Sequence, residues 1–275
     1  MTKRTLWMPL GQLVLVLNSV VVLVPLLIMM LSAFKNTREI FQNAFDLPVV
    51  WRWENFTRVW VEAKFALYFR NSVVITLASI VVILVLGAMA GYALGRFRFG
   101  GNDLLYLYFL SGLMLPLRLG IIPLFILMRN LRLLDTPWAL ILTYAASGLP
   151  SAVFILTGFF RALPSDLDSA ARIDGASEWL IYRRVMLPLV RPALIIVAVY
   201  NLIPIWNDFF FPLVFIHSDR LKTVPLGMTA FFGQYYTDWA TLFAGLTLAA
   251  LPVVALYVLL SQHFIRGLTA GALKG

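Results

Sequence analysis

Residues 164–177 read Pro-Ser-Asp-Leu-Asp-Ser-Ala-Ala-Arg-Ile-Asp-Gly-Ala-Ser and form a polar island in an otherwise apolar chain. Two long apolar runs flank this island, residues 138–160 before it and residues 193–216 after it. A helix of roughly 20 apolar residues is long enough to cross the hydrocarbon core of a bilayer. The island is therefore predicted to connect two membrane helices outside the lipid.

Four more apolar runs of comparable length occur, at residues 10–34, 71–94, 104–128 and 241–264. The composition agrees, because 61% of the 275 residues are hydrophobic and only 13% are charged, whereas about a quarter are charged in a soluble domain. In lipid, each backbone polar group needs a partner within the segment, so the runs must be helices. The sequence predicts an all-α polytopic membrane protein with six transmembrane helices.

Several kinds of site are not expected. The chain has no cysteine, and its two histidines, His217 and His263, lie far apart, which argues against a disulfide or a zinc site. No lysine follows a glycine, as the phosphate-binding loop of an ATPase requires. No catalytic constellation is evident, so no enzymatic activity and no cofactor are expected in this chain. The net charge of +9 fits basic residues that meet anionic lipid headgroups, and no nucleic-acid partner is expected.

Six helices put both termini on one side of the membrane. Lys3 and Arg4 begin the chain, but the apolar run after them is too long for a signal peptide and lacks an Ala-x-Ala site. With the termini inside, the inner segments hold eleven Lys and Arg residues and the outer segments hold ten. Six of those ten lie in the loop 35–70, among four acidic residues. The positive-inside rule then favours two cytoplasmic termini.

The polar island carries its own helix signals. Ser165 is placed to cap a short helix, with Asp168 in the position that completes a capping box. Gly175 suits the left-handed residue that ends such a helix, and Ser177 can cap a second one. Leu187-Pro188 is predicted to stop that second helix, because the residue before proline disfavours helix. The expected shape is helix, glycine turn, helix, a shape that also suits an ordinary amphipathic connection.

The order Ala170-Ala171, Asp174-Gly175-Ala176-Ser177, Leu187-Pro188 and Pro192 resembles the cytoplasmic coupling loop of bacterial ABC importer permeases. The resemblance implies that residues 161–192 dock on separate ATPase subunits, which bind the ATP and Mg²⁺. Ser169 stands where the family usually has Glu, so a charged contact is either absent or partly replaced by Asp168. The implied ATPase-coupling residues are Ala170, Ala171, Asp174, Gly175, Ala176, Leu187 and Pro188.

Other segments resemble the carbohydrate-uptake permeases of the maltose-transporter type. They include Leu115-Pro116, residues 206–209 and the tail 267–275, and the resemblance extends over about residues 71–275. It implies a type I ABC importer permease fold in the bacterial plasma (inner) membrane and a role in ATP-driven, binding-protein-dependent carbohydrate import. The implied partners are a second related permease subunit, two ATPase subunits, an extracytoplasmic sugar-binding protein and membrane lipid. A permease for a polyamine or a glycerol phosphodiester is the alternative.

Four residues inside the apolar runs are candidates for a substrate path: Arg118, Trp206, Asn207 and Asp208. Ionisable residues at membrane depth usually face a cavity or a partner. Asn207 and Asp208 suit hydrogen bonds to sugar hydroxyls, and Trp206 or a phenylalanine suits stacking on a pyranose face. Helix capping at a kink, or a salt bridge, is the structural alternative.

The remaining expectations concern packing and domain layout. Gly87, Gly91 and Gly95 recur every four residues, which lets another helix approach closely. We expect this contact within the chain, with a subunit interface as the alternative. Residues 1–70 are predicted to form the first transmembrane helix and a long extracytoplasmic loop, and residues 71–265 the permease core. Residues 266–275 are predicted to form a cytoplasmic tail, which the resemblance implies reaches the ATPase dimer in extended form.

Overall fold

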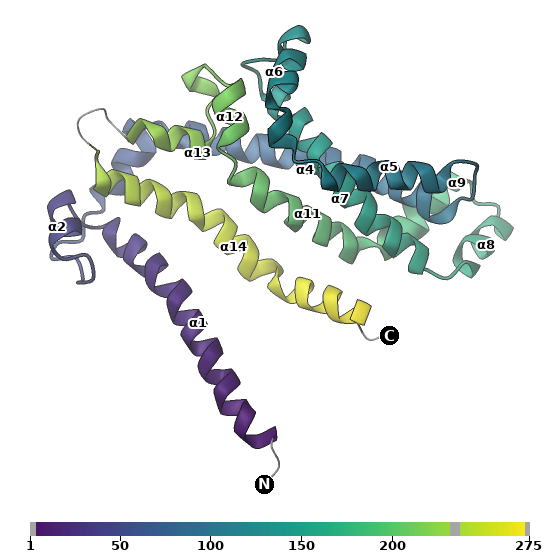
Figure 1. Ribbon diagram of the computed structural model, residues 1–275, viewed down its shortest axis with the longest axis horizontal. Helices are drawn as coiled ribbons and strands as arrows, with labels where there is room; N and C mark the ends of the chain where they lie inside the picture. Colours follow the sequence, from purple (N-terminus) through teal and green to yellow (C-terminus); the bar gives the residue numbers. More distant parts are fainter. Residues whose placement is uncertain (1–3, 232–236, 273–275) are drawn as a thin grey trace. The chain divides into compact units, whose positions relative to one another are not determined.

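The computed structural model describes residues 4–231 and 237–272, and its regular elements in these ranges are helices (Figure 1). The predicted all-α architecture is confirmed.

The chain divides into two compact units, Met1–Leu67 with Gly227–Val254 and Tyr68–Leu226 with Ala255–Gly275. The α-helices are α1 (Arg4–Ser32), α2 (Thr37–Gln42), α3 (Glu54–Thr57), α4 (Phe65–Arg96), α5 (Asn102–Met114), α6 (Ile121–Asn130), α7 (Pro137–Ala162), α8 (Asp166–Ile173), α9 (Glu178–Leu180), α10 (Leu187–Leu189), α11 (Arg191–Trp206), α12 (Phe210–Phe215), α13 (Val224–Gly227) and α14 (Trp239–Ala272). Short π-helical turns are η1 (Arg58–Glu62) and η3 (Ile181–Met186), and 3-10 turns are η2 (Leu117–Gly120), η4 (Asp219–Leu221) and η5 (Met228–Phe231).

By length and composition, four helical segments of the described chain can cross a membrane. Two bent pairs raise this number to six if each pair is one span. One pair joins Asn102–Met114 to Leu117–Asn130 at 84°, and the other joins Glu178–Leu189 to Arg191–Trp206 at 72°. The four single segments are Gly11–Ser32, Phe65–Arg96, Pro137–Ala162 and Trp239–Leu256.

Two of the predicted membrane runs are not single helices, and proline explains both breaks. In the run 104–128, Leu115 is extended (φ −89°, ψ 114°), because Pro116 follows it. The run 193–216 stops at the end of α11 and resumes at α12. Pro212 has no N–H, and its ring would clash with the carbonyl of residue 208 in a continuous helix. Both predicted single helices are therefore wrong at these points.

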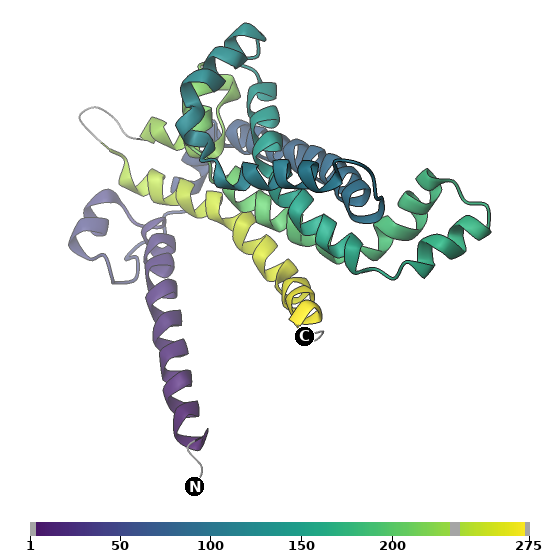
Figure 2. The ribbon, with the colours of Figure 1, turned by 45° about the vertical axis from the view of Figure 1, so that its right-hand side comes forward.

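Helix α7 is the centre of the second unit and packs against α4, α5 and α11 (Figures 1 and 2). A Cβ added at Gly87 would lie 2.6 Å from the Cβ of Ala152. At Gly91 and at Gly95 the nearest α7 side-chain atom would lie at 2.9 Å. The glycine spacing therefore serves a backbone-close contact between α4 and α7, and the prediction of packing within the chain is confirmed.

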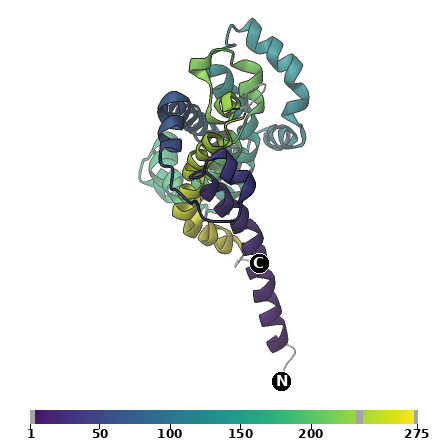
Figure 3. The ribbon, with the colours of Figure 1, turned by 90° about the vertical axis from the view of Figure 1, so that its left-hand side faces the viewer.

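The sequence correctly predicted helix α1 but not the end of helix α14. Helix α1 is one long helix (Figure 3) whose side chains at residues 11–27 are exposed, as befits a membrane span. Helix α14 continues to Ala272, so the expectation of an extended tail from residue 266 is wrong for residues 266–272. Those residues advance the chain by about 10 Å as a helix instead of about 23 Å in extended form. Residues 273–275, with Lys274, lie outside the described residues.

Candidate functional site

The polar island forms the predicted helix, glycine turn and helix. Helix α8 ends at Ile173, and Gly175 is left-handed with φ +79°. The Ser177 hydroxyl accepts the backbone N–H of Leu180 at 3.4 Å and so caps α9. In Figures 1 and 2 these elements extend beyond the ends of α4 and α7, away from the helix bundle of their unit. We call residues 161–192 the coupling loop.

Two expectations about the ends of these short helices are wrong. Ser165 has helical backbone angles (φ −67°, ψ −25°), and its side chain caps no N–H group. The second helix passes through Leu187 and Pro188 and breaks only at Val190 (φ −93°, ψ 12°). The π-helical turn η3 explains the passage, because the N–H of Leu187 bonds to the carbonyl of Tyr182 in the wider register of a π-helix.

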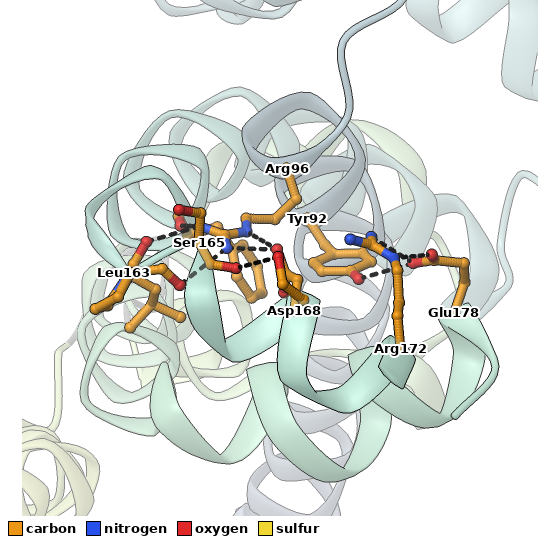
Figure 4. Close-up of polar contacts among 10 residues, drawn as sticks. Tyr92, Arg96, Leu163, Ser165, Asp168, Arg172 and Glu178 are labelled. Atoms are coloured by element: carbon orange, nitrogen blue, oxygen red, sulfur yellow. Dashed lines mark hydrogen bonds and ion pairs between the residues drawn. The ribbon is translucent and has the colours of Figure 1, made fainter. Parts of the chain in front are cut away.

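Asp168 joins the coupling loop to the end of α4 (Figure 4). The Arg96 Nε donates to Asp168 Oδ2 at 2.7 Å, and Arg96 Nη2 contacts the same oxygen. Arg96 also donates to the carbonyls of Leu163 at 2.7 Å, Pro164 at 3.1 Å and Phe160 at 3.2 Å. The Arg96 and Asp168 side chains are only 7% and 8% exposed. Asp168 therefore points into the protein, and the suggestion that it replaces a Glu contact to an ATPase is wrong.

A second set of contacts bridges the glycine turn. Arg172, on α8, donates to the two carboxylate oxygens of Glu178, on α9, at 2.7 and 3.3 Å. The Tyr92 hydroxyl of α4 donates to Glu178 at 3.4 Å (Figure 4). The buried pair at Arg96 and this bridge hold both arms of the coupling loop against α4.

The seven predicted coupling residues split into two groups. Ala170, Asp174 and Gly175 are exposed. Ala171, Ala176 and Leu187 are partly buried and pack against the core of the unit, and Pro188 is also partly buried. The exposed part of the loop is enlarged by Ile173 (85% exposed) and Trp179 (59% exposed), two large apolar side chains that the sequence analysis did not single out.

A second candidate site is a cleft of about 320 Å³ in the same unit. It lies where the two proline-associated breaks meet α7. Arg118 comes from η2, Asp208 from the break between α11 and α12, and Tyr144 from α7. Their side chains line the cleft together with those of Ser147, Ser151, Tyr200 and Asn201.

Asp208 is the most buried charged group of this cleft, with a side chain 6% exposed. The Tyr144 hydroxyl donates to its Oδ2 at 2.9 Å, and the Phe211 N–H donates to the same oxygen at 3.1 Å. Arg118, 70% exposed, contacts Oδ1 at 3.4 Å. Opposite charge and hydrogen bonds satisfy the carboxylate, as a buried ion requires. Both the predicted salt bridge and the predicted cap at the kink occur, and both involve Asp208.

The other two predicted path residues do not line the cleft. Trp206 is only 6% exposed and packs edge-on against Phe69, with ring centroids 5.6 Å apart. That burial contradicts the expectation that its ring stacks on a sugar. The Asn207 amide donates to the carbonyl of Ile203 at 3.1 Å, at the end of α11. Asn207 thus acts in the described chain as a helix-end residue.

The sequence analysis missed several cleft residues. The residues missed are Tyr144, Ser147 and Ser151, whose hydroxyl groups are not distinctive within an apolar run. Their spacing of three and four residues, however, places them on one helix face. Asn201, a polar residue within the run 193–216, also lines the cleft. Its amide donates to the Val197 carbonyl at 2.9 Å and to the Ser151 hydroxyl at 3.5 Å. Among the described residues, no group of three His, Cys, Asp or Glu side chains is placed to hold a metal ion.

Comparison with known proteins identifies the family of the chain. A family model described as "Binding-protein-dependent transport system inner membrane component" matches residues 83–270. The chain is 40% identical over 263 residues to the diacetylchitobiose uptake system permease protein NgcG of Streptomyces coelicolor, covering 94% of this chain and 87% of the relative. It is 32% identical over 263 residues to the maltodextrin transport system permease protein MdxG of Bacillus subtilis, covering 95% and 94%.

The fold has a counterpart among solved structures. A chain in the crystal structure of a bacterial ABC transporter involved in the import of the acidic polysaccharide alginate superimposes with a TM-score of 0.85. The two chains are 20% identical, and the superposition covers 96% of this chain and 99% of the other. The likeness confirms the predicted importer permease fold.

Proposed function

We propose that this chain, which belongs to the family of binding-protein-dependent transport system inner membrane components, forms half of the translocation pathway of an ATP-driven carbohydrate importer. The family makes it a transport subunit of the inner membrane, as expected from the sequence. The other half would be a second related permease, and two separate ATPase subunits would hold ATP and Mg²⁺. An extracytoplasmic sugar-binding protein would deliver the solute. Both termini would then be cytoplasmic.

The anchored coupling loop is the observation that carries the proposal. Force from an ATPase reaches the membrane helices only if the receiving element is stiff. Arg96 ties α8 to α4 through one buried ion pair and three carbonyls, and Arg172 ties α8 to α9. Ala170, Asp174 and Gly175, beside the exposed Ile173, would form the docking surface. The tail 266–275 would lie on the same side.

The cleft supports an uncharged polar solute. Sugar hydroxyls both donate and accept hydrogen bonds, and Ser147, Ser151 and Asn201 offer both functions. Tyr200, 57% exposed, offers an aromatic face. Arg118 and Asp208 form one opposite pair, so the cleft has no surplus charge to attract a polyamine or a phosphodiester. The relatives named for diacetylchitobiose and maltodextrin uptake favour an oligosaccharide, and we propose that class here.

The test is ATP hydrolysis by the purified complex in lipid vesicles. Binding protein loaded with a short oligosaccharide should raise the hydrolysis rate and drive uptake of the labelled sugar. A polyamine and a glycerol phosphodiester serve as the competing solutes. Stimulation by either of these without response to any oligosaccharide would reject the carbohydrate assignment. Purification of this chain alone with full transport activity would reject the four-subunit arrangement.

A further inference from the structure

The first unit contains a polar cleft of about 570 Å³ for which the transport proposal has no use. Its walls come from the segment that follows α1, from residues 52–58 and from the start of α14. They include Arg38, Arg52, Arg58, Phe41 and Asp238. All of these residues belong to the same compact unit, so the cleft is formed within one body.

The charges in this cleft are unevenly compensated. Asp238 is occupied as the cap of α14, because it accepts the Thr241 N–H at 3.2 Å and the Thr241 hydroxyl at 2.6 Å. Arg52 pairs with Glu54 at 3.2 Å, yet its Nε is buried without a hydrogen-bond partner. A buried donor without a partner is costly, so the site lacks an acceptor.

Two further guanidinium groups form no direct ion pair among the described residues. Arg38 and Arg58 are exposed, and neither lies within ion-pair distance of a carboxylate in the part of the chain that the structure describes. The two carboxylates among the described lining residues, those of Glu54 and Asp238, already have partners. The cleft therefore presents two guanidinium groups outside ion-pair distance of a carboxylate and one orphaned N–H donor.

Lining residues on two sides of the cleft lie next to the end of a candidate membrane span. The span Gly11–Ser32 ends just before the first lining residue, Asn36, and the span Trp239–Leu256 begins directly after Asp238. Figure 3 shows the segment after α1 folded at the end of that helix. Residues at this depth lie among lipid headgroups.

The aromatic residues around the cleft agree with this depth. Trp51, Trp53 and Trp60 are 49%, 66% and 46% exposed, and Phe41, in the lining itself, is 67% exposed. Exposed tryptophan is typical of the membrane–water interface, where one part of the ring contacts lipid and another contacts water. These exposed aromatic side chains favour a lipid over a soluble acidic protein as the occupant of the cleft.

We propose that this cleft binds the phosphate group of an anionic phospholipid. The guanidinium groups of Arg38 and Arg58 would hold the phosphate oxygens, since the planar fork of arginine matches phosphate geometry. The orphaned Nε of Arg52 would donate to a third acceptor of the headgroup. The glycerol and the first methylenes would lie along Phe41. A lipid held here links the end of α1 to the start of α14, whichever solute the transporter carries.

The experiment uses the purified transporter in nanodiscs of phosphatidylcholine with or without phosphatidylglycerol. Native mass spectrometry after mild delipidation counts the retained phosphatidylglycerol and yields its affinity in a titration. We expect the double variant Arg38→Gln/Arg58→Gln to bind about a hundred- to ten-thousandfold more weakly, because each of the two lost hydrogen bonds to a charged group removes a factor of about ten to a hundred. Arg129→Gln is the matched control, an exposed arginine of the other unit, and should bind as the wild type does.

Three results would overturn the proposal. The first is equal retention of phosphatidylglycerol and phosphatidylcholine by the wild type. The second is an unchanged affinity in the double Gln variant. The third is full displacement by millimolar inorganic phosphate, which would identify a site for small anions. The variant Arg38→Lys/Arg58→Lys keeps both charges, so a binding strength between wild type and the Gln variant separates lost recognition from misfolding.

Discussion

Removal of the Arg96 side chain should release the coupling loop while leaving the membrane helices folded. Arg96→Ala leaves the Asp168 carboxylate buried without its cation and deprives three carbonyls of a donor. Breaking a buried ion pair by removing one partner costs about 3–5 kcal/mol. At about 1.4 kcal/mol per factor of ten, the population of the released loop should rise by roughly two to nearly four powers of ten.

Limited trypsin digestion measures this population. The loop contains several arginines, and the cleavage rate follows the population of the open form when opening is fast relative to cleavage. We therefore expect cleavage within residues 161–192 to accelerate by at least about a hundredfold in Arg96→Ala. Uptake per ATP hydrolysed should fall in the same variant, because a released loop cannot transmit force.

The matched control is Arg52→Ala, which breaks an ion pair whose side chains are 36% and 51% exposed. Exposed pairs contribute about 0–1 kcal/mol, so digestion of the coupling loop should be unchanged. A second variant, Asp168→Asn, keeps the shape of the side chain and should show a smaller effect than Arg96→Ala. Cleavage of the Arg96→Ala loop at the wild-type rate would refute the idea that the buried pair holds it.

Three further predictions address the glycine turn, the cleft and a loop contact. Gly175→Asp should uncouple ATP hydrolysis from uptake or release the ATPase subunits. The control is Gly101→Asp, at another exposed glycine with positive φ. This control should add a similar backbone strain of about 1–2 kcal/mol and leave coupling intact. Tyr144→Phe removes a donor to the buried carboxylate of the cleft and should lower the thermal midpoint and the uptake rate, with a cost of about 1.5–3 kcal/mol. The hydroxyl of Ser218, aided by the backbone N–H groups of residues 217 and 218, lowers the pKa of Asp135. The ionised Asp135 carboxylate should contribute its full stabilisation of the folded protein above its unfolded pKa of about 4. This contribution should be lost as the pH falls through the lower pKa of the folded state. The thermal midpoint should therefore fall over this pH range, and Asp135→Asn should abolish that pH dependence.

Local chemistry was readable from the sequence where neighbouring residues decide the structure. Gly175 adopts the left-handed angle, Ser177 caps its helix, and the glycines at four-residue spacing pack against another helix, all as predicted. Each of these outcomes depends on backbone sterics or on a hydrogen bond within three residues. The permease family was likewise predicted from short sequence motifs.

Features set by distant residues were not readable. Asp168 was predicted to help cap α8, yet its partner is Arg96, separated from it by 72 residues. Pro188 was predicted to stop a helix, yet the helix continues through it after a π-helical turn in which the Leu187 N–H bonds to the Tyr182 carbonyl. Trp206 was predicted to face the solute, and its burial against Phe69 depends on how α4 and α11 pack. Tertiary packing decides the outcome at Asp168 and Trp206, whereas at Pro188 the backbone of the preceding turn does.

Helix α7 connects the two candidate sites and indicates how movement passes between them. Its last three turns or so are held against α4 by the three glycines, which contact residues 152–160, and the Arg96 anchor begins at Phe160. This part of α7 must therefore move with α4 and the coupling loop. Pro150 lies inside α7 directly before the held segment, and proline removes a helix hydrogen bond there. Tyr144 lies on the other side of Pro150, where it holds the Asp208 carboxylate. A displacement of the coupling loop is then expected to bend α7 at Pro150 and to strain the contact at Tyr144, so that the cleft changes shape while the loop stays rigid.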